Sequence, residues 1–179
     1  MNVKYIRFSN DDLRHILDDE KRCFRIAVNE QDITDVEMTE VGLQARRDGH
    51  DDCEVIQPPY SVGDILAIRE TWAEIDGKYV YRADGDTPNG KLLMNWKPST
   101  QMPKDAARTF IRITDLTVER LWDISLTDIA DEGIWLQGTL SPEYVFAMKW
   151  NDGMSERKRQ KFGWDQNPWV WVLRFELMK

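Results

Sequence analysis

The stretch WVWVLRFEL at residues 169–177 has an apolar side chain at every second position, and its other face carries Arg174 and Glu176 together with Val170 and Val172. Successive side chains of a β-strand point to opposite faces, so every second residue shares one face. The five residues on that face are all apolar: Trp169, Trp171, Leu173, Phe175 and Leu177. The pattern predicts a strand packed on a core, with Trp171 buried rather than serving as a stacking platform.

Two other tryptophans lie outside this strand pattern. Trp164 precedes it in the irregular stretch FGWDQNP, and we interpret it as a candidate wall of a binding pocket. Trp96, in NWKPS, is predicted to lie on a loop, where it either closes over a ligand or packs beneath the loop.

Short helices and strands alternate along the rest of the chain. Ser9, Ser125 and Ser141 each precede a run with helical spacing, and Gly133 is placed to end the second helix. Residues 61–75 and 78–84 are predicted as strands joined by a turn at Asp76-Gly77. A helical turn after Pro103 leads into another long strand. This order predicts a single domain, residues 1–179, that is either a small β-barrel or an α+β fold.

Charge is unevenly distributed. The net charge is −8, and residues 29–56 hold nine acidic residues against Arg46 and Arg47. We interpret this segment as an acidic insertion or long loop with one helical turn, able to dock a basic protein partner. The remainder is nearly neutral, which argues against non-specific duplex binding but allows a pocket for one base or a short single strand.

The stretch SERKRQK at residues 155–161 is the basic counterpart of the acidic segment. Two interpretations stay open: a solvated helix end, or a contact for the phosphates of a single strand whose bases stack on aromatic rings. The cations in the second interpretation are Arg157, Lys158 and Arg159.

Other features exclude several classes. No apolar run reaches the roughly 18 residues of a membrane helix, and the first residues lack a signal-peptide core, so a cytoplasmic protein is expected. Cys23 and Cys53 are far apart and only two histidines are present. We therefore expect neither a metal nor an organic cofactor.

Several stretches resemble the ASCH family, a branch of the PUA-like superfamily, and in particular its phage- and prophage-encoded members. The matching stretches are LDDEKRCFRI (17–26), VGDILAIRETWA (62–73), the block from residue 95 to 134, and FGWDQNPWVWVLRFE (162–176). The resemblance implies a PUA-like curved barrel with short helices at its rim. It also implies a cleft that binds RNA or modified nucleotides.

One branch of this family is an N(4)-acetylcytidine amidohydrolase that uses a lysine, a threonine and a glutamate. The resemblance places the lysine on Lys21 and the glutamate on Glu132, but the threonine falls on Phe24. Catalysis would then need water activated by Glu132, or a hydroxyl from Thr71 or Ser125. The alternative role of Lys21 and Glu132 is an ion pair that closes the barrel rim.

Three further charged residues are cleft candidates. Arg25 matches an arginine of the family and could grip a phosphate or carbonyl, or pair with the acidic segment. Arg69 and Glu70 are strand neighbours, so only one can face inward, with Trp72 on the side of Glu70.

Three functions follow for the sequence. The first is a module that binds nucleic acid, with single-stranded RNA or a modified nucleoside as the ligand. The second is an amidohydrolase acting on N-acylated nucleosides. The third is a protein-interaction factor, for defence evasion or assembly, that docks through the acidic segment.

Overall fold

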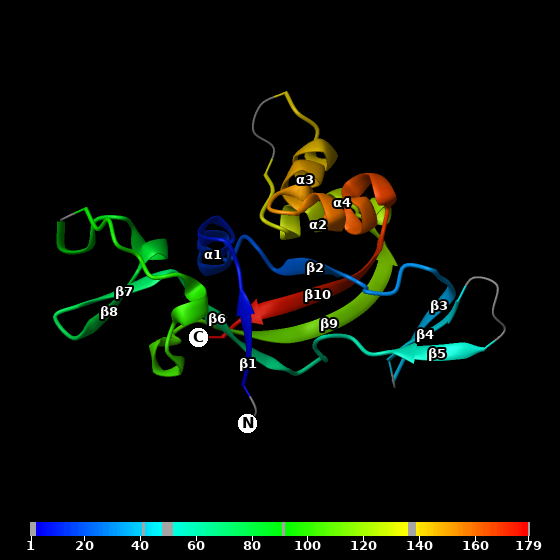
Figure 1. Ribbon diagram of the computed structural model, residues 1–179, viewed down its shortest axis with the longest axis horizontal. Coiled ribbons are helices and arrows are strands. Elements are labelled where there is room, and N and C mark those ends of the chain that lie inside the picture. Colours follow the sequence, from blue (N-terminus) through cyan, green and yellow to red (C-terminus); the bar gives the residue numbers. More distant parts are fainter. Residues whose placement is uncertain (1–2, 41, 48–51, 91, 136–138, 179) are drawn as a thin grey trace.

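A curved, mixed five-stranded sheet forms the centre of the computed structural model, which describes residues 3–40, 42–47, 52–90, 92–135 and 139–178 (Figure 1). Its strands, in spatial order, are β1 (Lys4–Arg7), β6 (Ile65–Arg69), β9 (Phe110–Arg120), β10 (Trp169–Leu177) and β2 (Cys23–Ala27). β1 runs parallel to β6, and the other neighbours are antiparallel. β1 and β2 are therefore the edge strands.

The predicted serine caps are confirmed. Ser9, Ser125 and Ser141 each accept a hydrogen bond from the backbone N–H three residues later. They begin α1 (Asn10–Leu17), α2 (Leu126–Asp131) and α3 (Pro142–Asn151), which are followed by α4 (Glu156–Phe162). α2, α3 and α4 gather in one layer beside β2 and β10, whereas α1 lies near the β1 end (Figure 1).

The predicted turn at Asp76-Gly77 is also confirmed. Both residues have positive φ, as a tight hairpin turn requires, and they join β7 (Trp72–Ile75) to β8 (Lys78–Tyr81). The segment 61–75, expected as one strand, is divided between β6 and β7, which belong to different sheets. The expected helical turn after Pro103 is a short 3₁₀ helix, Lys104–Ala106.

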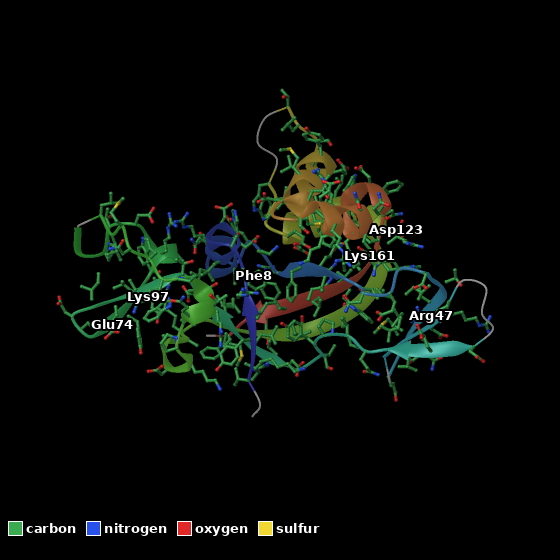
Figure 2. The ribbon with its side chains drawn as sticks, in the orientation of Figure 1. Phe8, Arg47, Glu74, Lys97, Asp123 and Lys161 are labelled. Carbon is green, nitrogen blue, oxygen red and sulfur yellow. The ribbon has the colours of Figure 1, made fainter. Side chains whose placement is uncertain are left out.

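The acidic segment contains strands where a loop with a helical turn was expected. β3 (Ile33–Thr39), β4 (Gly42–Arg47) and β5 (Cys53–Ile56) form an antiparallel sheet at one end of the molecule (Figure 1). Arg47 lies at this end of the molecule (Figure 2). It neutralises part of the charge of the sheet through Asp32 and Glu54, at 3.1 and 2.8 Å. Ile33, Leu43 and Ala45 are buried between the strands and the rest of the core. So few apolar residues make a pattern too sparse to indicate strands from the sequence.

Two hydrophobic cores lie on opposite faces of β10. Trp171, Leu173 and Phe175 are buried in the first core, as predicted, while Trp169 and Leu177 at the strand ends are half-buried. Val170 and Val172 are buried as well, in a second core beneath the helical layer. The strand is thus covered on both faces, which its alternating pattern did not indicate.

Candidate functional site

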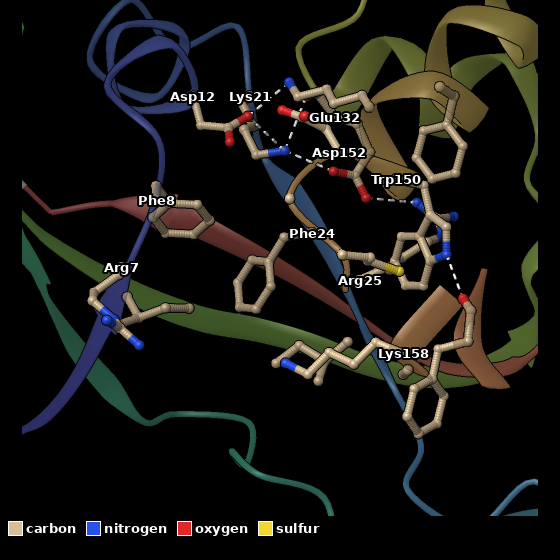
Figure 3. A pocket seen from close by; sticks show the side chains of 18 of the residues that line it. Arg7, Phe8, Asp12, Lys21, Phe24, Arg25, Glu132, Trp150, Asp152 and Lys158 are labelled. Atoms are coloured by element: carbon tan, nitrogen blue, oxygen red, sulfur yellow. Dashed lines mark hydrogen bonds and ion pairs between the residues drawn. The ribbon is translucent and has the colours of Figure 1, made fainter. Parts of the chain in front are cut away.

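A cavity of about 590 Å³ lies between the two edge strands of the sheet (Figure 3). Residues 6–8, at the end of β1 and just after it, form one wall. Residues 24–27 of β2 form the other. Residues from α3, from α4 and from the turn between them complete the lining. The pocket is therefore the opening between the two edge strands.

The polar end of the pocket is built around Lys21 and Glu132. The Lys21 ammonium donates to Oε2 of Glu132 at 2.6 Å and to its backbone oxygen at 2.9 Å. Both residues are almost fully buried, and a backbone bridge also joins them. Gly133 permits this approach, since its φ is +76° and a Cβ there would lie 3.3 Å from that of Lys21.

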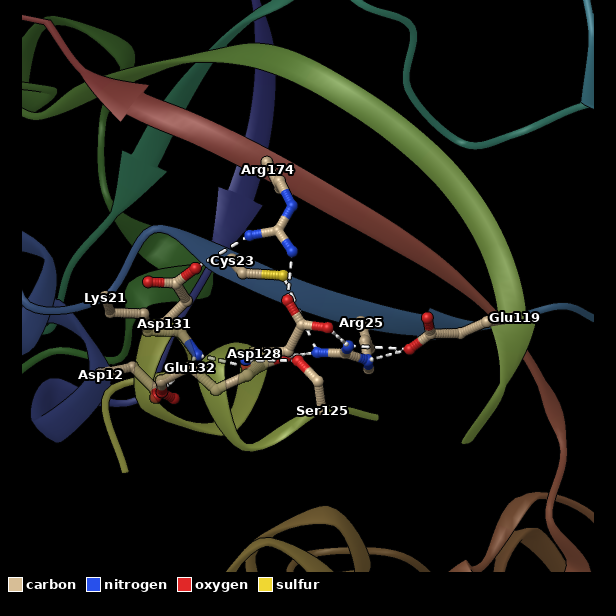
Figure 4. Close-up of polar contacts among 10 residues, drawn as sticks. All are labelled: Asp12, Lys21, Cys23, Arg25, Glu119, Ser125, Asp128, Asp131, Glu132 and Arg174. Atoms are coloured by element: carbon tan, nitrogen blue, oxygen red, sulfur yellow. Dashed lines mark hydrogen bonds and ion pairs between the residues drawn. The ribbon is translucent and has the colours of Figure 1, made fainter. Parts of the chain in front are cut away.

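Arg25 holds the other oxygen of Glu132. Its guanidinium donates to Oε1 at 3.0 Å and also lies 2.8 Å from Glu119 and 3.3 Å from Asp128 (Figure 4). Three carboxylates therefore engage this buried arginine, and Glu132 receives a cation on each oxygen. Such pairing fixes the carboxylate rigidly at the pocket end.

Asp12 extends this network to the helical layer. One oxygen lies 2.7 Å from the Lys149 ammonium and 3.5 Å from that of Lys21. Burial raises the pKa of Asp12, but the charges of Lys21 and Lys149 outweigh burial and leave that pKa below its ordinary value. The Asp12 carboxylate thus links α1 to α3 across the pocket end.

Aromatic rings form much of the remaining wall. Phe8 meets Phe24 edge to face at 5.4 Å between ring centroids, and Trp150 stacks on Phe146 at 6.3 Å. The Trp150 indole donates to the backbone oxygen of Phe162 at 2.7 Å, which fixes its orientation. Tyr60 also lines the pocket.

Among the described residues, the edge of β2 that faces away from β10 has no neighbouring strand. Val28 donates to Trp169, and Arg22 accepts from Phe175, both at 2.9 Å. In an antiparallel pair the bonded residues alternate, so the even residues of β2 bond to β10. The N–H and C=O groups of Arg25 and Ala27 therefore point toward the pocket.

Phe24 occupies the position where the family resemblance placed a threonine, and its ring packs on Phe8 and Phe175. Neither proposed substitute lines the pocket. Ser125 caps α2, and Thr71 lies between β6 and β7. Among the described lining residues there is no serine, threonine or cysteine.

Several predicted site residues lie elsewhere. Glu70 is buried against Arg108 and Thr109, at 2.9 and 3.0 Å. Arg69 lies over the ring of Tyr5 and donates to the backbone oxygen of Thr100. Neither Arg69 nor Glu70 is among the described residues that line the large pocket.

The predicted tryptophans also lie outside the pocket lining. Trp72 is buried in a separate cluster, with the Lys97 ammonium 4.5 Å from its ring centre. Trp96 is half-buried outside the described pocket lining. Trp164 packs edge to face on Phe146 at 5.8 Å, so it supports the wall from behind.

The basic helix α4 contributes one predicted cation to the pocket. Lys158 lines it, whereas Arg157 and Arg159 are exposed outside the described lining. Arg7 and Lys149 were not predicted, because their sequence neighbourhoods carry no distinguishing pattern. The lining has five cations against three carboxylates, although the chain is acidic overall: Arg7, Lys21, Arg25, Lys149 and Lys158 against Asp12, Glu132 and Asp152.

The described ranges contain no group of three or more His, Cys, Asp or Glu residues arranged to hold a metal ion. No helix in those ranges is both long and apolar enough to cross a membrane.

The architecture is that of an α+β domain, a mixed sheet with helices at its opening. The chain matches no family model and no curated protein. Its structure is similar to the ASCH domain from Lactobacillus crispatus JV V101, with a TM-score of 0.50 and 14% identity over 98% of this chain and 79% of that one. A protein from Enterococcus faecalis V583 aligns with a TM-score of 0.48 and 11% identity, over 99% and 76% of the two chains. The similarity to the Lactobacillus crispatus domain confirms the ASCH-like fold that the sequence motifs predicted.

Proposed function

We propose that the pocket binds one nucleobase, either of a modified nucleoside or of an unstacked residue in single-stranded RNA. The observation that carries the proposal is the composition of the cavity. It joins aromatic walls to a rigid, buried polar end, within a volume of about 590 Å³ that suits a small ligand. The resemblance of residues 95–134 to phage-encoded proteins supports a phage origin.

Each part of the pocket has a role in this proposal. Aromatic rings such as Phe8 and Trp150 offer apolar contact to the faces of a base, as in single-strand RNA recognition. The backbone groups of Arg25 and Ala27 offer both donors and acceptors to the edge of the base. Glu132 and Lys21, held in place by their neighbours, would fix its orientation.

Titration with cytidine, N(4)-acetylcytidine and an RNA trinucleotide tests the proposal, followed by tryptophan fluorescence and NMR. Trp150→Phe should remove the fluorescence response, whereas Trp122→Phe, outside the described lining, should keep it. Glu132→Gln should weaken binding about tenfold, the value of one charged hydrogen bond. Glu74→Gln, on the exposed hairpin, is the matched control. Unchanged fluorescence and NMR shifts with all three ligands at millimolar concentration would overturn the proposal.

A second candidate is hydrolysis of N-acylated nucleosides, favoured by the contact of 2.6 Å between Lys21 and Glu132 in the pocket. Water would add to the acyl carbon, with Glu132 accepting its proton and returning it to the leaving amine, so that the C–N amide bond breaks to give the deacylated nucleoside and a carboxylate. The absence of a hydroxyl at Phe24 makes binding the first proposal.

Acetate release from N(4)-acetylcytidine tests this candidate. If the chemistry operates, Lys21→Ala and Glu132→Gln should each abolish release while the protein stays folded. Phe24→Thr should match or exceed the wild-type rate, since it restores a hydroxyl. No release from the wild type or from Phe24→Thr would exclude the hydrolase function.

A further inference from the structure

We infer that the ligand of this pocket carries a phosphate, held between Arg7 and Lys158, so that the pocket takes a nucleotide rather than a free nucleoside. The inference rests on the proposed function and narrows its ligand class. A mononucleotide and an internal residue of single-stranded RNA share this chemistry.

The cations of the lining divide into two groups. Lys21, Lys149 and Arg25 are each paired with carboxylates at 3.0 Å or less. Within the described residues, the side chains of Arg7 and Lys158 have neither a hydrogen bond nor an ion pair. These two cations are thus free to bind an anion, while the other three are committed to the protein.

The two free cations come from different walls of the same cavity. Arg7 ends β1, and Lys158 lies in the first half of α4. Both extend on the side of Phe24 away from Lys21 and Glu132 (Figure 3). A base directed toward Glu132 would therefore place its sugar phosphate toward Arg7 and Lys158, where two charged donors can engage it.

Charge at this side of the pocket supports the assignment. Glu132 and Asp12 belong to the paired network at the other end, and the third lining carboxylate, Asp152, lies beside Glu132 at that same end (Figure 3). The two free cations on the other side of Phe24 therefore leave an excess of positive charge for a phosphate. Because Arg7 and Lys158 are exposed, the attraction should weaken as salt is added.

Calorimetric titration with cytidine, cytidine 5′-monophosphate and cytidine 3′-monophosphate tests the inference. One monophosphate should bind about tenfold more tightly than cytidine at low salt, and this advantage should shrink at high salt. Arg7→Gln and Lys158→Gln should each remove most of the advantage and leave the Kd of cytidine unchanged. Arg157 is adjacent to Lys158 on α4 but lies outside the described lining. Arg157→Gln should therefore change neither the Kd of cytidine nor that of the monophosphates.

The outcomes separate this inference from the proposed function. Equal affinity for cytidine and both monophosphates would overturn the phosphate site but leave a nucleoside pocket. If neither these three ligands nor an RNA trinucleotide binds, both the phosphate site and the proposed function are overturned. A trinucleotide that binds more tightly than either monophosphate would support the phosphate site with RNA as its source, whereas equal affinities would support a mononucleotide.

Discussion

Cys23 and Cys53 differ sharply in their surroundings. Cys23 is fully buried in the second core, and burial, with a further contribution from the charge of Glu132, raises its pKa to about 12. Cys53 is exposed on β5. Because the thiolate is the reactive form, iodoacetamide at pH 8 should modify Cys53 and spare Cys23 in the folded protein. Mass spectrometry should show one adduct when folded and two in urea; rapid double labelling of the folded protein would contradict the burial of Cys23.

At the scale of single residues, some residues of the site could be predicted from sequence motifs, whereas others were found only from the tertiary structure. Lys21 and Glu132 lie 111 positions apart, and only the family resemblance suggested that they meet; the structure places them 2.6 Å apart. Arg7 and Trp150 had no such motif. The place of Arg7 depends on β1 lying opposite β2 across the opening, and that of Trp150 depends on the position of α3 in the helical layer. Local sequence pattern encodes neither relation.

Among the elements, α2 is attached to the sheet through Asp128. Its carboxylate pairs with Arg174 of β10 and lies 3.3 Å from Arg25 of β2. Burial raises the pKa of Asp128, but Arg174, the Ser125 hydroxyl and Arg25 together lower it below the ordinary 3.8. A carboxyl with a lowered pKa stabilises the fold above its unfolded pKa, and this contribution disappears as the pH falls through the folded pKa.

Asp128→Asn should therefore reduce the free energy of unfolding at pH 7 by about 1–3 kcal/mol, the cost of unsatisfied buried polar partners. The difference from wild type should begin to shrink as the pH falls below 3.8, the ordinary pKa of the carboxyl, and should disappear as the pH falls through the lower pKa of folded Asp128. Urea unfolding at pH 7 and pH 3 measures both values. Asp123→Asn is the control, because Asp123 is exposed and pairs with no described residue. An equal loss at both pH values would show that the carboxylate charge is not what holds α2.

The predictability of the elements followed the strength of their local signals. Serine caps and the Asp76-Gly77 turn act within a few residues, so the sequence located them correctly. Residues 29–56 were missed as strands because their outer faces carry acids and only a few inner side chains are buried. Tertiary packing, rather than local propensity, decides such strands.

On the scale of the whole molecule, β10 joins the two cores. Trp171 belongs to the first core, whereas Val170 and Val172 belong to the second, so neither core can lose this strand alone. We therefore expect cooperative unfolding in one step, with coincident transitions by tryptophan fluorescence and far-UV circular dichroism.

Trp171→Ala should lower the free energy of unfolding by about 3–5 kcal/mol, because it truncates a large core side chain. Val172→Ala should lower the same single transition, and Trp135→Ala, exposed at 52%, should change stability by less than about 0.5 kcal/mol. Two separate transitions would show that the two cores unfold independently. A loss of stability below about 1 kcal/mol for Trp171→Ala would show that this tryptophan does not anchor the strand.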